Sequence, residues 1–159
     1  MAKPEAKIVV TIAAFAEGQA IPAKFTGEGV DVSPAVAWAD VPEGTKELAI
    51  IMDDPDAPTS EPWVHWVMYK IPADVKGLAE GAGKPGGAEG VQGANTFGNN
   101  GYNGPMPPKG HGVHHYHVKV YALDQGVSLG TGADKGALLA AIKGHVLGMG
   151  EVVGTYERK

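Results

Sequence analysis

Residues 101–124 read Gly-Tyr-Asn-Gly-Pro-Met-Pro-Pro-Lys-Gly-His-Gly-Val-His-His-Tyr-His-Val-Lys-Val-Tyr-Ala-Leu-Asp, a loop rich in glycine and proline followed by an alternating pattern. Proline fixes φ and removes a backbone donor, whereas glycine permits positive φ and close backbone approach. We therefore expect a rigid loop that leads into a strand. One face of that strand is predicted to carry His114, Tyr116, Val118, Val120 and Ala122, and the opposite face His115, His117, Lys119, Tyr121 and Leu123. His114 and Tyr116 can therefore supply hydrogen bonds inside a largely apolar pocket.

Chain length and composition predict one loop-rich β domain. The chain has 159 residues, which is long enough to bury a hydrophobic core without disulfides or bound metal ions. Residues 1–159 are therefore predicted to form a single domain. Its 24 glycines and 12 prolines punctuate apolar runs and do not form a low-complexity tract. The net charge of −5, together with the absence of any run of Lys or Arg, argues against nucleic acid as a partner.

The chain also lacks the sequence signals of several other protein classes. It has no cysteine, which excludes disulfides and thiolate metal sites. The apolar run 8–16 imitates a short signal peptide, but Pro4 and Glu5 interrupt the basic region before it, and we interpret the run as a first strand. No stretch approaches the roughly 18 apolar residues of a membrane span. We expect a cytoplasmic protein.

The order of elements is predicted from apolar patterning and turn residues. Asp134 is a candidate N-cap for a helix that ends near Gly144. The long glycine-rich segment 79–100 is interpreted as a surface loop at the mouth of a site. Besides the alternating strand 114–123, the predicted strands are 7–15, 35–39, 47–53, 63–72, 127–129 and 151–157, with an edge segment at 20–25, a helix at 134–143 and a helical turn at 145–150.

Acidic residues crowd the end of the strand 47–53, where the chain reads Asp53-Asp54-Pro55-Asp56. Taken alone, this is ordinary turn chemistry, in which carboxylates accept local backbone N–H bonds. In the next strand, Trp63, His65, Val67, Tyr69 and Ile71 are predicted to share a face. A histidine in an apolar row is usually a hydrogen-bonded core residue, and His65 gains functional interest only if Asp54 or Asp56 lies beside it.

Metal binding and hydrolysis are the enzymatic alternatives, and neither finds a motif in this chain. Four histidines lie between His111 and His117, but alternation separates them and their spacing matches no tight zinc motif. A hydrolase would need a nucleophile, and no Gly-x-Ser-x-Gly elbow surrounds any serine. We therefore predict no catalytic residues, no metal ligands and no cofactor. Imidazoles, a tyrosine hydroxyl and loop amides fit a small anion site better.

The motifs resemble those of the phosphatidylethanolamine-binding protein family, also called Raf kinase inhibitor protein-like, and most closely its bacterial and archaeal branch. The similarity covers nearly the whole chain, with two signatures in the expected order. The matching stretches are Ile21-Pro-Ala-Lys-Phe-Thr-Gly-Glu-Gly, Ser33-Pro-Ala-Val-Ala-Trp, Asp54-Pro-Asp-Ala-Pro, Val64-His65-Trp66, Gly101-Tyr-Asn-Gly-Pro-Met-Pro-Pro-Lys-Gly with His114-His-Tyr116, Ile142-Lys-Gly-His145-Val-Leu and Val153-Gly-Thr-Tyr156.

This resemblance implies a mainly β fold, with a large central antiparallel sheet packed against a smaller sheet and one or two short helices near the C-terminus. It also implies a ligand-binding anion pocket made by Asp54, Asp56, His65, Tyr102, Gly104, Pro108, His114 and Tyr116. Three positions depart from the family pattern: His115 stands where Arg is usual, and Met106 and Gly27 stand where cysteine is frequent.

The leading hypothesis is a non-enzymatic protein that binds a small anionic ligand, either phosphate or a phosphoryl headgroup. A regulatory role for the protein is part of this hypothesis. An alternative is a protease or kinase inhibitor that acts through the pocket rim and the 79–100 loop. A weaker alternative is a phosphoester hydrolase or a metal-dependent enzyme. The sequence leaves the oligomeric state open, a homodimer included.

Overall fold

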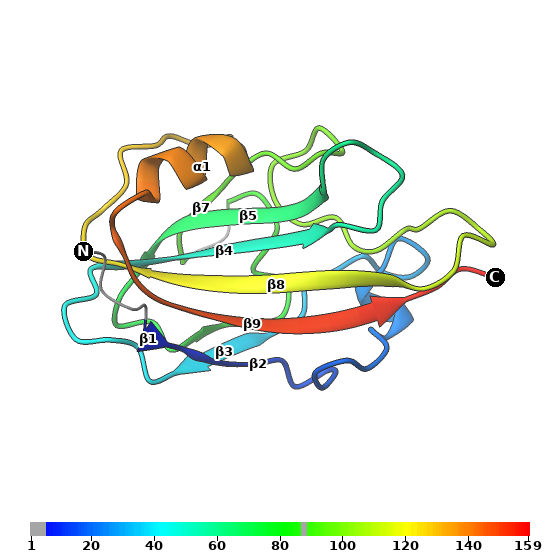
Figure 1. Cartoon of the computed structure of the whole chain (residues 1–159), viewed down its shortest axis with the longest axis horizontal. Helices are drawn as coiled ribbons and strands as arrows, with labels where there is room; N and C mark the ends of the chain where they lie inside the picture. The colour runs from blue at the N-terminus through cyan, green and yellow to red at the C-terminus, as the bar shows by residue number, and fades with distance from the viewer. Residues whose placement is uncertain (1–5, 87–88) are drawn as a thin grey trace.

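Two β-sheets form the body of the molecule, and one short helix covers the outer face of the larger sheet (Figure 1). The structure is a computed structural model, and it describes residues 6–86 and 89–159. The elements are β1 (Ala6–Lys7), β2 (Val9–Thr11), the 3-10 helix η1 (Ala23–Phe25), β3 (Val36–Ala39), β4 (Glu47–Asp54), β5 (Trp63–Pro72), β6 (Gly77–Leu78), β7 (Val91–Gln92), β8 (His114–Leu123), α1 (Lys135–Ile142) and β9 (Val146–Tyr156).

The large sheet has six strands in the order β1-β9-β8-β4-β5-β7, and the small sheet has the order β2-β3-β6. This confirms the predicted fold class. The large sheet is mixed where we predicted an antiparallel one, because the short β1 pairs in parallel with β9. The predicted first strand, 7–15, is in fact divided: β1 joins the large sheet, and β2 joins the small sheet through β3.

The two faces of the large sheet pack against different partners. Toward the small sheet, β8 contributes Val118, Val120 and Ala122 to the main core. Toward α1, the same strand contributes Tyr121 and Leu123 to a second apolar cluster. The alternation predicted for β8 is therefore confirmed, and every strand of the sheet centre divides its side chains between two cores.

Strand β5 does not keep the single face that we predicted for it. Its register against β4 shifts between Met52–Trp66 and Asp53–Val64, so one extra residue, His65, is inserted in β5 at that point. Such a bulge reverses the alternation. Trp66 consequently packs in the core between the sheets, whereas Val67 packs on the α1 side. The prediction that His65 shares a face with Val67 was wrong for this reason.

A second irregularity lies near the other end of β5, where Lys70 has a φ of 57° and the register against β4 shifts again. This left-handed residue separates Tyr69, which packs toward α1, from Ile71, which packs between the sheets. A one-residue insertion moves all following side chains to the other face. The two bulges together set which β5 side chains reach each core.

Helix α1 begins and ends as predicted. The side chain of Asp134 accepts a hydrogen bond from the backbone N–H of Ala137 at 2.8 Å, and Gly144, with a φ of 82°, follows the last turn. Leu138 and Ile142 are buried against the sheet, while Leu139 is exposed. No helix in the described part of the chain is long and apolar enough to cross a membrane.

Three local predictions were wrong. The segment 145–150 is not a helical turn, because β9 begins at Val146 and pairs with β8. The segment 127–129 forms no strand. The edge segment 20–25 consists of one bridge from Ala20 to Thr155 and then η1. Each of these short segments takes its conformation from its neighbours in space, which local patterning does not report.

Candidate ligand-binding site

A cavity of about 210 Å³ lies where the end of β4 meets the beginnings of β5 and β8. Most of its polar side chains come from these neighbouring strands: Asp54 from β4, His65 from β5, and His114 with Tyr116 from β8. Thr59 joins them from the loop between β4 and β5. Its remaining wall is largely apolar and includes Trp63, Phe97, Met106, Pro107 and Pro108. The volume lies below the roughly 300 Å³ at which drug-sized sites begin, so it suits a group of few heavy atoms.

A chain of hydrogen bonds runs from the floor of this cavity to the surface. Nδ1 of His114 donates to Oδ2 of Asp54 at 2.6 Å, and both side chains are buried. The other ring nitrogen of His114, Nε2, lies 2.6 Å from Nδ1 of His111, which is exposed. Oδ1 of Asp54 accepts a hydrogen bond from the backbone N–H of Asp56 at 2.8 Å. The carboxylate therefore orients the ring of His114, and His111 links it to solvent.

His65 is held in one tautomer by the backbone. Its Nδ1 lies 2.7 Å from the carbonyl oxygen of Asn103, which can only accept, so Nδ1 carries the proton. Burial lowers the pKa of His65 below its ordinary value of 6.5. The carbonyls of Asn103 and Gly104 and the carboxylates of Asp54 and Asp31 oppose this effect without cancelling it. The neutral ring leaves Nε2 as a hydrogen-bond acceptor.

The hydroxyl of Tyr116 is buried and has no hydrogen-bond partner among the described residues. Its ring packs edge-on against His65, with 5.2 Å between the ring centroids. Burial is the largest cause that raises the pKa of Tyr116 well above its ordinary value of 10.0, and the carboxylates of Asp54 and Asp56 add to it. Asp54 lies near enough for a weak hydrogen-bonding contribution to that pKa, but it makes no hydrogen bond of normal geometry with the hydroxyl. The group thus remains a protonated donor. A buried donor without a partner costs free energy, about 1–3 kcal/mol, that a ligand could recover.

The structure brings some of the predicted site residues together at this cavity and leaves others outside it. Asp54, His65, Pro108, His114 and Tyr116 all line the cavity, and they come from three strands and the proline-rich loop. The remaining predicted residues are Asp56, Tyr102 and Gly104, and none of them lines it. The ligand-binding role of the whole set stays a prediction.

Asp56 pairs with the neighbour of the pocket histidine. Its Oδ2 accepts from the backbone N–H of His115 at 2.8 Å and lies 2.7 Å from Nδ1 of the same residue. Partial burial would raise the pKa of Asp56, but the hydrogen bonds from His115 outweigh it and hold the pKa below 3.8. His115, which stands where the resembling family usually has Arg, keeps a pairing role that now depends on its own protonation. Asp56 therefore fixes the turn after β4 from outside the cavity.

Tyr102 and Gly104 hold the loop that forms the cavity wall. The hydroxyl of Tyr102 donates to the carbonyl of Phe25 at 2.6 Å, and its ring packs on Trp66. The N–H of Gly104 donates to Oδ1 of Asp31 at 2.7 Å, and a Cβ at this glycine would lie 2.1 Å from the carbonyl oxygen of Phe25. Both residues support the loop at a distance from the cavity.

Sequence reasoning missed His111, Trp63 and Phe97. His111 was grouped with the strand histidines, although it lies in the loop before them. Its position between Gly110 and Gly112, with φ values of 73° and 94°, was the available signal, because such a backbone can fold a side chain back onto His114. Trp63 and Phe97 contact each other edge-on at the cavity rim, at a centroid distance of 5.5 Å. No local pattern links residues this far apart in the sequence.

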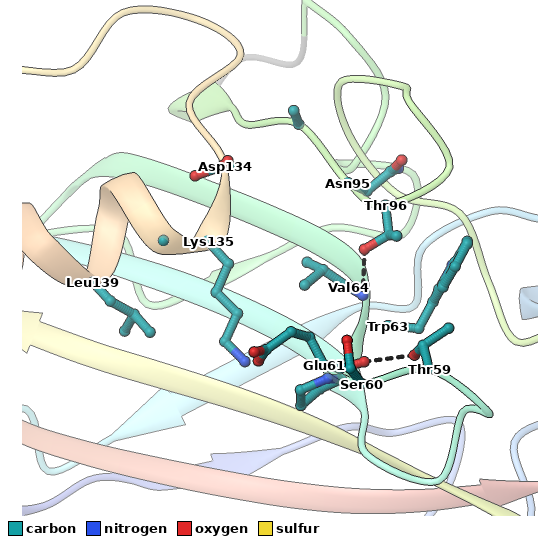
Figure 2. A pocket seen from close by; sticks show the side chains of 13 residues that line it. Thr59, Ser60, Glu61, Trp63, Val64, Asn95, Thr96, Asp134, Lys135 and Leu139 are labelled. Atoms are coloured by element: carbon teal, nitrogen blue, oxygen red, sulfur yellow. Dashed lines mark hydrogen bonds between the residues drawn. The ribbon is translucent and has the colours of Figure 1, made fainter.

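A second, larger hollow lies on the α1 side of the same sheet and has a volume of about 670 Å³. Figure 2 shows that α1 supplies Lys135 and Leu139 to it, with Lys135 extending toward the 59–62 loop. Nζ of Lys135 pairs with Oδ2 of the buried Asp53 at 2.6 Å. Trp63 and Thr59 line both hollows and so form the wall between them.

Among residues 6–86 and 89–159, no three His, Asp or Glu side chains converge in a geometry that could hold a metal ion. The histidines of β8 and the loop before it have other partners. His115 pairs with Asp56, and His117 lies 3.1 Å from Glu151.

Comparison with known proteins agrees with this architecture. A UPF0098 protein of Pyrococcus abyssi is 46% identical over 157 residues, which cover 96% of this chain and 87% of the relative. The crystal structure of Escherichia coli YbcL superposes with a TM-score of 0.91 at 35% identity and covers 97% of this chain and 100% of that one. A phosphatidylethanolamine-binding protein homologue from Chlamydia trachomatis gives a TM-score of 0.87 at 39% identity, covering 96% and 99% of the two chains.

A more distant likeness shows the fold alone. The structure of a carboxypeptidase Y inhibitor in complex with its cognate proteinase has 18% identity and a TM-score of 0.58, and the match covers 98% of this chain and 85% of that chain. The family model described as phosphatidylethanolamine-binding protein matches residues 11–157 of this chain. The chain therefore belongs to the phosphatidylethanolamine-binding protein family.

Proposed function

We propose that this protein binds a small anion, either phosphate or the phosphoryl group of a headgroup, in the cavity between Asp54, His65, His114 and Tyr116. The observation that carries the proposal is the Tyr116 hydroxyl, a buried donor at the cavity with no partner among the described residues. Such a group is costly unless a ligand accepts its hydrogen bond. The small volume and the surrounding imidazoles favour a compact anion with several oxygen atoms.

We further propose that the protein binds its ligand without turning it over. The aliphatic hydroxyl that lines the cavity belongs to Thr59, and it donates to the carbonyl of Glu61 at 2.6 Å, so its proton is not directed to a base. His114 already donates to Asp54 and contacts His111. A hydroxyl becomes an activated nucleophile only when it donates to a base, and the Thr59 hydroxyl donates to a carbonyl instead. A cytoplasmic location stays a prediction, which cell fractionation would test. A regulatory role also stays a prediction.

Titration with phosphate and with O-phosphoethanolamine, followed by the NMR signals of the histidine rings, tests the proposal. The signals of His65 and His114 should shift at millimolar ligand, while that of His145, which pairs with Asp124 outside the cavity, should not. If neither His65 nor His114 responds to either ligand at this concentration, the cavity is not an anion site.

A second candidate function, inhibition of a protease or kinase, is favoured by the apolar rim of the cavity. Phe97 and Met106 line the cavity and are each 40% exposed, so both present apolar surface to solvent at its rim. Phe97 belongs to the 79–100 segment that the sequence placed at the mouth. If the rim binds a partner enzyme, Phe97→Ser should abolish inhibition, whereas His65→Ala should leave it largely unchanged. The opposite pattern would show that the cavity itself makes the contact.

A further inference from the structure

The polar side-chain atoms of Asp54 and His114 at the cavity already have partners. Oδ1 of Asp54 accepts from Asp56, and Oδ2 accepts from Nδ1 of His114. Nε2 of His114 is bonded to His111. The oxygens of Asp54 are acceptors, and an anion needs donors. Nε2 of His114 is taken up by His111, so neither residue has a free N–H or O–H group for an anion.

Tyr116 and His65 each offer a ligand one side-chain atom, and the two atoms are of opposite kinds. The hydroxyl of Tyr116 is a donor without a partner among the described residues. Nε2 of His65 is an acceptor, because Nδ1 of the same ring carries the proton that goes to the carbonyl of Asn103. The two rings lie edge to face, with 5.2 Å between their centroids, so one small group can meet both.

A donor and an acceptor side by side match a group that itself has both functions. A singly protonated phosphoryl group is such a group, since its P–OH donates while its unprotonated oxygens accept. A fully deprotonated anion such as sulfate offers acceptors only. It would face the lone pair of His65 Nε2 and leave that nitrogen without a partner.

We propose that this site recognises phosphoryl groups that carry one proton, and that the pair of Tyr116 and His65 distinguishes them from anions without a proton. The inference rests on the proposed anion-binding function and specifies its ligand. No bond is made or broken in binding, and the proton stays between the phosphoryl oxygen and Nε2 of His65. The bound complex therefore holds one proton more than the free protein plus the fully deprotonated anion.

The charges around His65 agree with this assignment. The groups that face it are the carboxylates of Asp54 and Asp31 and the rings of His114 and Tyr116. The buried carboxylate of Asp54 repels a second anion, and adding a proton to that anion lowers the repulsion. Burial lowers the pKa of His65, so near neutral pH the protein does not bring the proton itself. The ligand or the solvent must supply it.

Calorimetric titration of the full chain with inorganic phosphate and with sodium sulfate tests this inference. Near pH 6.5 phosphate should bind at least about tenfold more tightly than sulfate, because one unpaired buried acceptor costs on the order of 1.4 kcal/mol or more. A phosphomonoester such as O-phosphoethanolamine loses its last proton at its second pKa, about 6, so above that pH its affinity should fall by about tenfold per pH unit, with uptake of about one proton per anion when buffers of different ionisation enthalpy are compared. Inorganic phosphate still carries one proton as HPO4²⁻ and should keep most of its affinity over the same range.

The His65→Gln variant sharpens the test. Its side-chain amide offers an N–H donor as well as an acceptor, so sulfate should gain affinity relative to phosphate and the ratio of the two should fall toward one. His145→Gln, at a histidine outside the cavity, is the matched control and should keep the wild-type ratio. A variant that merely weakened the fold would lower binding of both anions together and leave the ratio unchanged.

The possible outcomes separate the two proposals. Tighter binding of phosphate than of sulfate, together with proton-linked binding of O-phosphoethanolamine, supports the inference. Equal binding of both anions, with no uptake of protons, overturns the inference and leaves the anion site standing. If neither anion binds to the folded wild-type protein, the proposed function falls as well.

Discussion

Asp53 and Asp54 are neighbours in the sequence and both are buried, yet they serve opposite faces of one sheet. Asp53 faces α1 and pairs with the ammonium group of Lys135 at 2.6 Å. Asp54 faces the cavity and receives a hydrogen bond from the imidazole of His114 at 2.6 Å. Alternation along β4 is the reason for this separation.

The partner decides what each carboxylate can do. The ammonium group of Lys135 is a compact point charge, so the Asp53 pair is a fixed neutralised unit. His114 is a ring with two distinct nitrogens, and its second nitrogen continues to the exposed His111. One face of the sheet therefore holds a structural ion pair, and the other holds a chain of hydrogen bonds that runs from the cavity to the surface.

The largest effect is expected where the structural pair is broken. Lys135→Met leaves the Asp53 carboxylate, whose side chain is 4% exposed, without a counter-charge. Removing one partner of a buried pair is strongly destabilising, and we expect a loss of about 3 kcal/mol in the free energy of unfolding, measured by urea denaturation. Phosphate binding should remain, because the cavity lies on the other face.

The double variant Asp53→Asn/Lys135→Met checks the physical reason. With no uncompensated charge left, most of the lost stability should return. Lys84→Met, at an exposed lysine, is the control for loss of a positive charge and should change stability by less than about 0.5 kcal/mol. A double variant as unstable as Lys135→Met alone would show that packing of the lysine stem, and not the ion pair, stabilises this face.

An intermediate effect is expected from acid on the cavity face. His65 has a lowered pKa in the folded protein, so below its ordinary value of 6.5 the unfolded chain binds a proton that the folded chain resists. The contribution of this group to stability is therefore complete above that pH. It falls by up to about 1.4 kcal/mol per pH unit as the pH drops, until the folded-state pKa is reached.

Urea denaturation of wild type and His65→Gln at about pH 7.5 and about pH 5.5 measures this term. The wild type should lose more stability than the variant between the two conditions. His117→Gln, on the outward face of β8, is the matched control. An identical loss in wild type and His65→Gln would mean that His65 is not the group that resists protonation.

The smallest effect on stability is expected at Tyr116, and its sign is the informative part. Tyr116→Phe removes a buried hydroxyl that has no partner in the described structure, so the free energy of unfolding should rise by up to about 1 kcal/mol. The same change should weaken phosphate binding by about tenfold, since one hydrogen bond to the anion is lost. Thermal unfolding and calorimetry on the same sample measure both. A variant that is less stable than wild type would show that the hydroxyl already has a partner in the free protein.

Much of the framework was predictable because it rests on local physical chemistry. The β-branched and apolar runs predicted β4 and β5, and the alternation in residues 114–123 predicted both faces of β8. Asp134 and Gly144 marked the ends of α1 through their capping properties. The motifs also pointed to Asp54, His65, His114 and Tyr116 as one group, which the structure brings to one cavity.

By itself, then, the sequence determined the strand and helix signals, the composition of the two faces of β8 and the family motifs, because these depend on neighbours within a few residues. Tertiary structure alone decided the bulge at His65, the return of His111 onto His114 and the division of Asp53 from Asp54 between two partners. The reason is that each of these features depends on an atom contributed by a different strand, loop or helix. Which nitrogen or hydroxyl stays free for a ligand follows only when all those partners are in place.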